Sequence, residues 1–234
     1  MPHNAIYERY DLRRNYTWRS VTPSPKSDAE RNPWLPSHVR LALAESVQRS
    51  LIQPSACVPP GGVALGIVDG KMASLRKLSL WRVASQQCLI SRFTTLCLGG
   101  QHGTGGPCVV STGPAALPAV NAQFGSESYS QLSWAKWDLL HIALTHGARV
   151  ALFIDADVVL LSNPFSHLPR HQLLGHHFSF QEEVASCPQL ACAAPCRINT
   201  GMIAVSNASF TREVLRQLYP RRWKARMPLD QDVL

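Results

Sequence analysis

Charged residues are scarce in this chain: they make up 16% of its 234 residues, against 45% hydrophobic residues. This balance excludes a chain that is disordered throughout, because the apolar residues suffice for a substantial core. No run approaches the ~20 apolar residues of a membrane span, and residues 1–10 lack the apolar segment of a signal peptide. We therefore expect no membrane span in this chain, and any targeting segment would lie outside it.

Patterns that would assign a function class at once are also missing. The glycine-rich segment 99–107 has no Lys-Ser/Thr pair, so it is not a phosphate-cradling P-loop. Cys187, Cys192 and Cys196 lack the two-residue spacing of paired zinc ligands. The net charge of +8 is concentrated near the two ends of the chain, without the interleaved aromatic residues of a nucleic-acid motif. We predict no nucleic-acid partner, whereas a phosphorylated small substrate suits a basic surface.

Seven cysteines leave two interpretations open. One or two disulfides with at least one free thiol would suit an oxidising compartment, and buried reduced cysteines are the alternative. The tripeptides 15–17 and 207–209 match the acceptor pattern for N-glycosylation, which agrees with the first interpretation but also arises by chance.

Hydrophobic periodicity divides the chain into two parts. Residues 1–58 are rich in Pro, Arg and Ser and predict a partly disordered extension with one short helix within 39–50. Residues 59–234 predict a domain in which strands alternate with helices, which is typical of an α/β fold with a mostly parallel sheet. The strands are expected at 63–68, 94–98, 109–111, 149–154, 178–180 and in the segment 199–205, and the helices at 73–91, 129–145 and 210–219. Gly147 would end the second helix and Ser209 would cap the third.

Segment 151–161 carries the strongest indication of chemistry. Its apolar run is interrupted by Asp155 and Asp157 and then resumes. Apolar runs of this length predict a strand buried on both faces, and two acids at the end of such a strand are costly to bury unpaired. We therefore expect both carboxylates at the carboxyl edge of the sheet, where open α/β sheets bind ligands. Carboxylates are suitable ligands for Mg²⁺ or Mn²⁺, ions that also hold substrate phosphates.

Three interpretations of this acid pair compete. The two acids can be ordinary surface residues of a loop. They can belong to a phosphohydrolase of the haloacid dehalogenase type, with Asp155 as the nucleophile, although the Gly-Asp-x-x-x-Asp pattern that completes its metal site is absent. They can form a metal–diphosphate site in an enzyme that uses a sugar nucleotide, and only this interpretation also accounts for other segments of the chain.

Those segments are Trp134–Trp137, Phe153–Val159, Asn199–Val205 and Leu229–Leu234, and they occur in this order. Together they resemble the retaining glycosyltransferases of the GT-A fold, the group that contains glycogenin and the bacterial lipopolysaccharide galactosyltransferases. They are also similar to related nucleotide-diphospho-sugar transferase domains. The resemblance covers roughly residues 61–234, and it implies a Rossmann-like GT-A sheet flanked by helices.

The resemblance also implies a role for each matching residue. Asp155 and Asp157 would hold Mn²⁺ or Mg²⁺ against the diphosphate of the donor, where the cation neutralises the charge of the leaving group. Lys136 would contact the donor phosphates or sugar. Asn199 and Gly201 would contact the donor sugar, and glycine would let the backbone approach closely.

The end of the chain completes the implied site. Gln231 would lie close to the reacting carbon. Asp230 and Asp232 are its two neighbours, and an acid at this place would bind sugar hydroxyls. The resemblance further implies a UDP-sugar donor, a glycan, glycoprotein or glycolipid acceptor, retention of configuration, and a location in the Golgi or another secretory-pathway lumen. The family usually supplies a third metal ligand, a histidine, beyond Asp232, and the chain ends at Leu234. A non-catalytic module that binds sugar nucleotides is therefore a further alternative.

Overall fold

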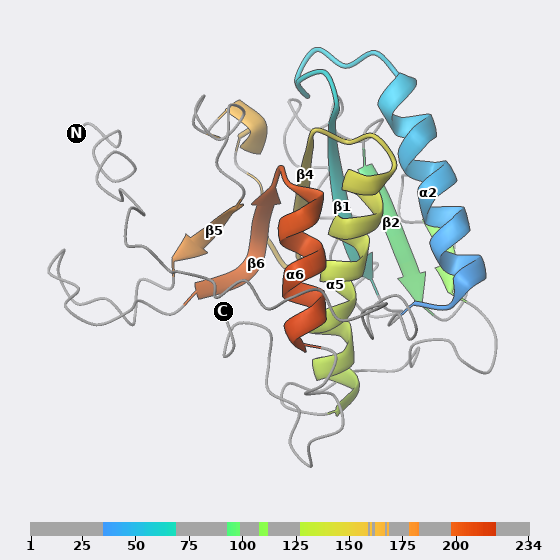
Figure 1. Cartoon of the computed structure of the whole chain (residues 1–234). Helices are drawn as coiled ribbons and strands as arrows, with labels where there is room; N and C mark the ends of the chain where they lie inside the picture. The colour runs from blue at the N-terminus through green and yellow to red at the C-terminus, as the bar shows by residue number, and fades with distance from the viewer. Residues whose placement is uncertain are drawn as a thin grey trace, which may run out of the picture.

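The computed structural model contains ten helices and strands within the residues that it describes (Figure 1). The described residues are 35–68, 93–98, 108–111, 127–158, 160, 162–166, 168, 178–182 and 198–218. The strands are β1 (Gly62–Val68), β2 (Phe93–Leu98), β3 (Cys108–Ser111), β4 (Val150–Ile154), β5 (Phe178–Glu182) and β6 (Ile198–Val205). The helices are α2 (Ser37–Ile52), α5 (Glu127–Thr145), α6 (Ala208–Leu218) and the short 3₁₀ helix η3 (Pro164–Ser166).

The strands form one six-stranded sheet in the order β3-β2-β1-β4-β6-β5. Strands β1 to β4 pair in parallel, β6 runs antiparallel to β4, and β5 runs antiparallel to β6. The prediction of an α/β fold with a mostly parallel sheet and flanking helices is confirmed. The segment that begins with Asn199 is already part of β6 rather than a loop before it, which matters for the site.

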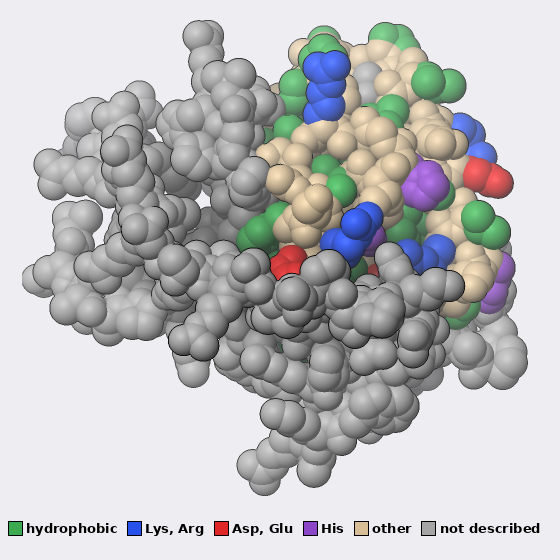
Figure 2. Space-filling view, viewed as in Figure 1, with side chains coloured by type: hydrophobic (Ala, Val, Ile, Leu, Met, Phe, Trp, Pro, Cys, Tyr) green, Lys and Arg blue, Asp and Glu red, His purple; other side chains and the backbone are tan. Residues whose placement is uncertain are grey.

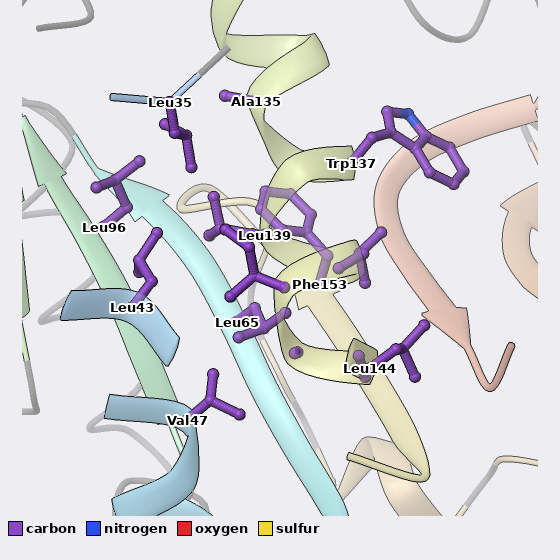
Figure 3. Close-up of a cluster of buried hydrophobic side chains, with 14 of the residues drawn as sticks. Leu35, Leu43, Val47, Leu65, Leu96, Ala135, Trp137, Leu139, Leu144 and Phe153 are labelled. Carbon is purple, nitrogen blue, oxygen red and sulfur yellow. The ribbon is translucent and has the colours of Figure 1, made fainter. Parts of the chain in front are cut away.

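The side chains of the central strands alternate between two hydrophobic clusters, as the period of two in a strand requires. Leu65 and Phe153 point to the face that α2, α5 and α6 cover, and they join the larger cluster with Trp137 and Leu139 of α5 (Figure 3). The intervening residues of β4 point to the opposite face and pack with Leu160 and Phe165. Both faces of β4 are therefore buried, as its continuous apolar sequence predicts.

Helix α5 packs on the sheet between α2 and α6 (Figure 1). Every residue from Ser133 to Leu140 is buried, so the helix is enclosed on more than the single apolar stripe that its sequence suggests. Gly147 follows it with φ +105°, a left-handed conformation that favours glycine and confirms the predicted helix end.

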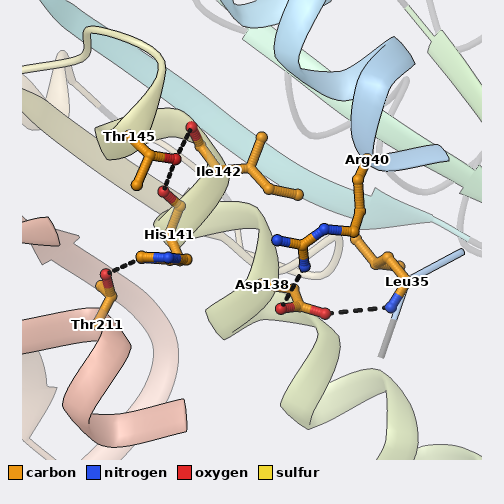
Figure 4. Close-up of polar contacts among 7 residues, drawn as sticks. All are labelled: Leu35, Arg40, Asp138, His141, Ile142, Thr145 and Thr211. Atoms are coloured by element: carbon orange, nitrogen blue, oxygen red, sulfur yellow. Dashed lines mark hydrogen bonds and ion pairs between the residues drawn. The ribbon is translucent and has the colours of Figure 1, made fainter. Parts of the chain in front are cut away.

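Helix α2 belongs to the same core, although the sequence places it in the N-terminal extension. Its buried side chains include Leu43 and Val47, which pack in the larger cluster. Asp138 of α5, itself buried, accepts hydrogen bonds from the backbone N–H of Leu35 (3.1 Å) and from Arg40 Nη1 (3.0 Å; Figure 4). This carboxylate therefore connects the chain before and within α2 to the central helix. The division at residues 58 and 59 stays a prediction.

Helix α6 begins at Ala208, two residues before the start at Phe210 that the sequence predicts. Asn207, not Ser209, is the capping residue: its Oδ1 accepts hydrogen bonds from the N–H groups of Ser209 (2.8 Å) and Phe210 (3.1 Å). An asparagine oxygen at this position satisfies the otherwise unpaired N–H groups of the first turn. The sequence contains both candidates, and the side-chain geometry selects Asn207.

His141 and Thr211 connect α5 to α6. The Thr211 hydroxyl donates to the carbonyl oxygen of Ala208 (2.9 Å), so its oxygen accepts from His141 Nδ1 at 2.9 Å, as Figure 4 shows. Burial lowers the pKa of His141 from 6.5 to about 4, and the positive charges of Arg212 and Arg40 act in the same direction. The ring is therefore neutral at physiological pH and carries its proton on Nδ1.

The two cysteines in the described ranges whose state is known are both disulfide-bonded, which favours the first of the two interpretations. Cys57 precedes β1, whereas Cys97 pairs with Val68 at the other end of that strand, about 20 Å away for seven residues of extended chain. The two residues therefore belong to separate disulfides. Such cross-links stabilise a folded domain mainly by restricting its unfolded chain.

Several predictions fall on residues that the structure does not describe: the helix at 73–91, the glycine-rich loop and most of the two basic clusters. On the face formed by α2, α5 and α6, the described Lys and Arg side chains are dispersed rather than gathered into one patch (Figure 2). Within the described part of the chain, no helix has the length and apolar character needed to cross a membrane.

Replacing Asp138 by Ala should lower the free energy of unfolding by about 2–3 kcal/mol, because it leaves the buried N–H of Leu35 without its acceptor. Asp138→Asn keeps an acceptor oxygen and should cost less. The control is Glu45→Ala, which removes an exposed ion pair to Arg49 at 3.8 Å and should change stability by less than about 0.5 kcal/mol. Denaturant unfolding measures all three, and equal effects of the two Ala variants would contradict this account.

His141 should make the stability of the protein depend on pH in a defined window. The pKa of His141 is about 4 in the folded state and 6.5 ordinarily. Between these pH values, His141 is protonated in the unfolded chain and neutral in the folded chain. The stabilisation from neutral His141 should be complete above pH 6.5 and disappear as the pH falls to about 4. We expect the difference in melting temperature between wild type and His141→Gln to shrink over this range, and a constant difference would contradict the assignment.

Candidate functional site

The antiparallel pairing of β4 with β6 brings two predicted site segments together. Ile154, the last residue of β4, pairs with Met202, so the next residue, Asp155, lies opposite Gly201. The Asp155 N–H donates to the carbonyl oxygen of Gly201 at 2.7 Å. Asp155 therefore lies at the carboxyl end of β4, and its backbone is hydrogen-bonded to residues 199–201 at the beginning of β6.

Gly201 leaves space that both polar neighbours occupy. A Cβ atom on residue 201 would lie 2.9 Å from Asn199 Oδ1 and 3.2 Å from Asp155 Oδ2, closer than ordinary van der Waals contact. Asn199 Oδ1 accepts a hydrogen bond from the Gly201 N–H at 2.8 Å. Glycine is needed here because side-chain oxygens approach its backbone, which gives a structural reason for the residue in addition to the predicted approach of a sugar.

Lys136 reaches the same place from α5. Its ammonium group donates to the carbonyl oxygen of Thr200 (3.1 Å) and to the Thr200 hydroxyl (3.0 Å), and it lies 3.9 Å from Asp155 Oδ2. It also lies 5.2 Å from the centre of the Phe153 ring, within the range of a cation–π contact. Only 5% of the lysine side chain is exposed, against 37% of the Asp155 side chain. The positive charge is therefore enclosed, whereas the carboxylate has a face open to solvent.

Asp157 lies in the turn that follows β4, and it is exposed. Between the two acids, Ala156 is buried and packs with Val68 and Cys97 at the carboxyl ends of β1 and β2. Packing of the middle residue anchors the turn on the sheet edge while both acids stay accessible to solvent. The predicted position of the pair at this edge is confirmed.

The chain after Asp157 is held by a polar anchor on the far face of the sheet. Asn163 donates through Nδ2 to the carbonyl oxygen of Cys57 (2.5 Å), and its Oδ1 accepts from the Phe165 N–H (3.0 Å). Leu160 and Phe165 are buried on that face. The turn with the two acids is thus fixed on both sides, by β4 before it and by this anchor after it.

A hard divalent cation is compatible with this arrangement. Asp155 offers a part-exposed carboxylate, and Gly201 leaves room beside its Oδ2. Among the residues that the structure describes, no three His, Cys, Asp or Glu side chains gather into a complete set of metal ligands. Mg²⁺ and similar ions commonly use one or two carboxylates, with water and substrate phosphates as the other ligands, and Asp155 and Asp157 suit that mode.

The structure thus brings four of the predicted residues into contact: Lys136, Asp155, Asn199 and Gly201. Asp157 lies two residues along the turn. Asp230, Gln231 and Asp232 lie outside the described residues, so their place is still a prediction. Thr200 was not selected from the sequence, although it stands between two selected residues. A hydroxyl at that position gave no signal by itself, because only the approach of α5 shows what it binds.

Comparison with known proteins agrees with this geometry. No match is found among curated proteins. The sequence model described as nucleotide-diphospho-sugar transferase matches residues 104–234, more than half of the chain. The matched region begins just before β3, extends to the last residue of the given sequence and includes every predicted site residue. The chain belongs to the nucleotide-diphospho-sugar transferase family, whose members use nucleotide-sugar donors.

Proposed function

We propose that the protein transfers a sugar from a UDP-sugar to an acceptor in a reaction that depends on Mn²⁺ or Mg²⁺. The observation that carries the proposal is the convergence of Asp155, Lys136 and the first residues of β6, 199–201, at the carboxyl end of β4. These residues come from three elements that are distant in sequence. A part-exposed acid with an enclosed cation behind it suits a ligand that carries both a metal ion and a diphosphate.

In the proposed reaction, Asp155 and Asp157 would hold the cation, whose positive charge would offset the charge of the nucleoside diphosphate leaving group. The hydrogen bond from the Asp155 N–H to Gly201 orients the carboxylate before the ligand arrives. Such preorganisation avoids the cost of ordering the site during the reaction. Asn199, held by its bond to the Gly201 N–H, is placed to present its amide N–H₂ group to sugar hydroxyls.

Lys136 adds positive charge behind the carboxylate. With 5% of its side chain exposed, it acts on the diphosphate through the field of its charge, which is felt strongly where water is excluded. This role differs in emphasis from the direct phosphate contact that the resemblance implies. Both roles lead to the same expectation, that the charge of Lys136 favours an anionic ligand.

We propose further that the transfer retains the configuration of the sugar, with Gln231 beside the reacting carbon and Asp230 and Asp232 at the sugar hydroxyls. The support is the resemblance of the ordered segments to retaining GT-A enzymes. A glycan, glycoprotein or glycolipid is the proposed acceptor. The disulfide-bonded Cys57 and Cys97 support a location in the Golgi or another secretory lumen, because disulfides persist in oxidising compartments.

Calorimetric titration with UDP, GDP and AMP, each with and without Mn²⁺, tests the donor site. We expect binding of UDP that requires Mn²⁺ and is abolished by Asp155→Asn and by Asp157→Ala. Glu45→Ala removes an exposed acid from α2, far from the site in the fold, and should bind UDP as the wild type does.

This titration, together with assays of phosphomonoester hydrolysis and of UDP-sugar transfer, separates the rival interpretations. Indifference to every nucleoside diphosphate would refute the proposal. Hydrolysis of a phosphomonoester through a covalent phosphoryl group on Asp155 would favour the phosphohydrolase. Binding of UDP and Mn²⁺ without transfer or hydrolysis of any UDP-sugar would favour the non-catalytic module.

Gly201→Ala should impair the site while the fold persists. Gly201 has ordinary strand backbone geometry, so the effect comes from the added Cβ, which displaces Asn199 Oδ1 or the Asp155 carboxylate. Because a displacement of about 1 Å can cost about a hundredfold in rate, we expect kcat/KM to fall by one to two orders of magnitude, with little change in melting temperature.

Gly147→Ala is the converse control. At φ +105°, alanine there is strained although its Cβ would make only an ordinary contact with Leu51 at 3.7 Å. It should destabilise the protein by about 1 kcal/mol or more, while UDP affinity is preserved. If Gly201→Ala transferred sugar as well as the wild type, the proposed use of the space beside Asp155 would be wrong.

A further inference from the structure

Thr200 contacts Lys136 through both its backbone and its side chain. It lies on β6 between Asn199 and Gly201, it is buried, and both its carbonyl oxygen and its hydroxyl oxygen accept hydrogen bonds from Lys136. The two distances, 3.1 and 3.0 Å, are ordinary hydrogen-bond lengths. Thr200 is therefore a main holder of the buried lysine.

The Lys136 ammonium group lies closer to the two Thr200 oxygens than to the Asp155 carboxylate. A lysine ammonium has three donors and must satisfy them when it is buried. A direct hydrogen-bonded pair with a carboxylate would have an N–O distance of about 2.7–2.9 Å, whereas Lys136 Nζ lies 3.9 Å from Asp155 Oδ2. Thr200 and the Phe153 ring hold the charge at the longer distance.

This separation has a consequence for Asp155. A lysine in direct contact would occupy Oδ2 with a hydrogen bond and compete with any other cation for the carboxylate. At 3.9 Å the lysine leaves the oxygen without that close contact, and its carboxylate remains 37% exposed. The attraction between the two charges weakens as their distance grows. The position of Nζ therefore affects how strongly Asp155 can bind a divalent ion.

We infer that Thr200 is a positioning residue, which holds the Lys136 ammonium group away from direct contact with Asp155 and thereby keeps that carboxylate available to a divalent cation. This inference rests on the proposed function, in which Asp155 binds the cation. The hydroxyl of Thr200 is the part that matters, because the backbone carbonyl is present whatever the side chain at this position.

The substitution Thr200→Val tests this role, because valine keeps the shape of threonine and removes the hydroxyl. Lys136 then loses its hydrogen bond to the hydroxyl, and Asp155 Oδ2 is a charged acceptor 3.9 Å away. We expect the ammonium group to move into contact with the carboxylate and Mn²⁺ affinity to fall about tenfold, as happens when partners of metal ligands are removed. Thr200→Ser keeps the hydroxyl and should restore the affinity to within about twofold of wild type.

Mn²⁺ binding is measured by electron paramagnetic resonance of the free ion, in the presence of UDP, for wild type and each variant. The same two substitutions are then made in a Lys136→Met background. If Thr200 acts through the lysine, Val and Ser at position 200 should give equal Mn²⁺ affinities there, because the double-mutant cycle removes the shared partner. If Thr200→Val does not fold, Thr200→Ala removes the same hydroxyl and takes its place.

The outcomes distinguish this inference from the proposal beneath it. A wild-type protein that binds no Mn²⁺ with UDP would overturn the proposed function and this inference with it. Wild-type Mn²⁺ binding that is unchanged in Thr200→Val would overturn the inference alone. Equal weakening by Thr200→Val with and without Lys136 would also overturn it, since the hydroxyl would then act without the lysine.

Discussion

The site depends on one pairing, the antiparallel contact between the ends of β4 and β6. The Asp155 N–H donates to the carbonyl oxygen of Gly201 at 2.7 Å, so the acid at the end of β4 meets the beginning of β6, 46 positions further along the sequence. A parallel partner at this edge would run its residues in the opposite direction past Asp155. The reversal of β6 is what lets the beginning of one strand meet the end of the other.

Helix α5 gives the site its positive charge and links the site to the rest of the fold. Successive polar side chains of this helix serve different partners: Lys136 reaches Thr200, Asp138 binds Leu35 and Arg40, and His141 binds Thr211. All three lie on a helix that is enclosed by the sheet and two other helices. Because its apolar residues are buried around these polar ones, the helix cannot rotate or slide without breaking several contacts at once.

The buried cation Lys136 and the part-exposed anion Asp155 differ in what surrounds them. Lys136 is enclosed, so its hydrogen bonds come from the protein, whereas Asp155 is open to a ligand. A charge that is held by neutral oxygens retains its field over several ångströms, while a charge in a direct ion pair is largely cancelled by its partner. In the proposed function, this arrangement would suit a ligand that contributes both a cation and an anionic group, as a metal-bound diphosphate does.

Much of this protein was predictable from local sequence. The apolar run before Asp155 predicted β4, the alternation of strands and helices predicted the α/β class, and Gly147 predicted the end of α5, because each depends on residues near one another in the chain. The order of motifs also predicted four residues that meet at the site. The tertiary structure decided the reversal of β6, the inclusion of α2 in the core, Asn207 as the cap of α6, and Thr200 as the partner of Lys136. Each of these depends on which surfaces pack together across long stretches of chain. The identity of a single residue does not indicate which distant residue will pack against it.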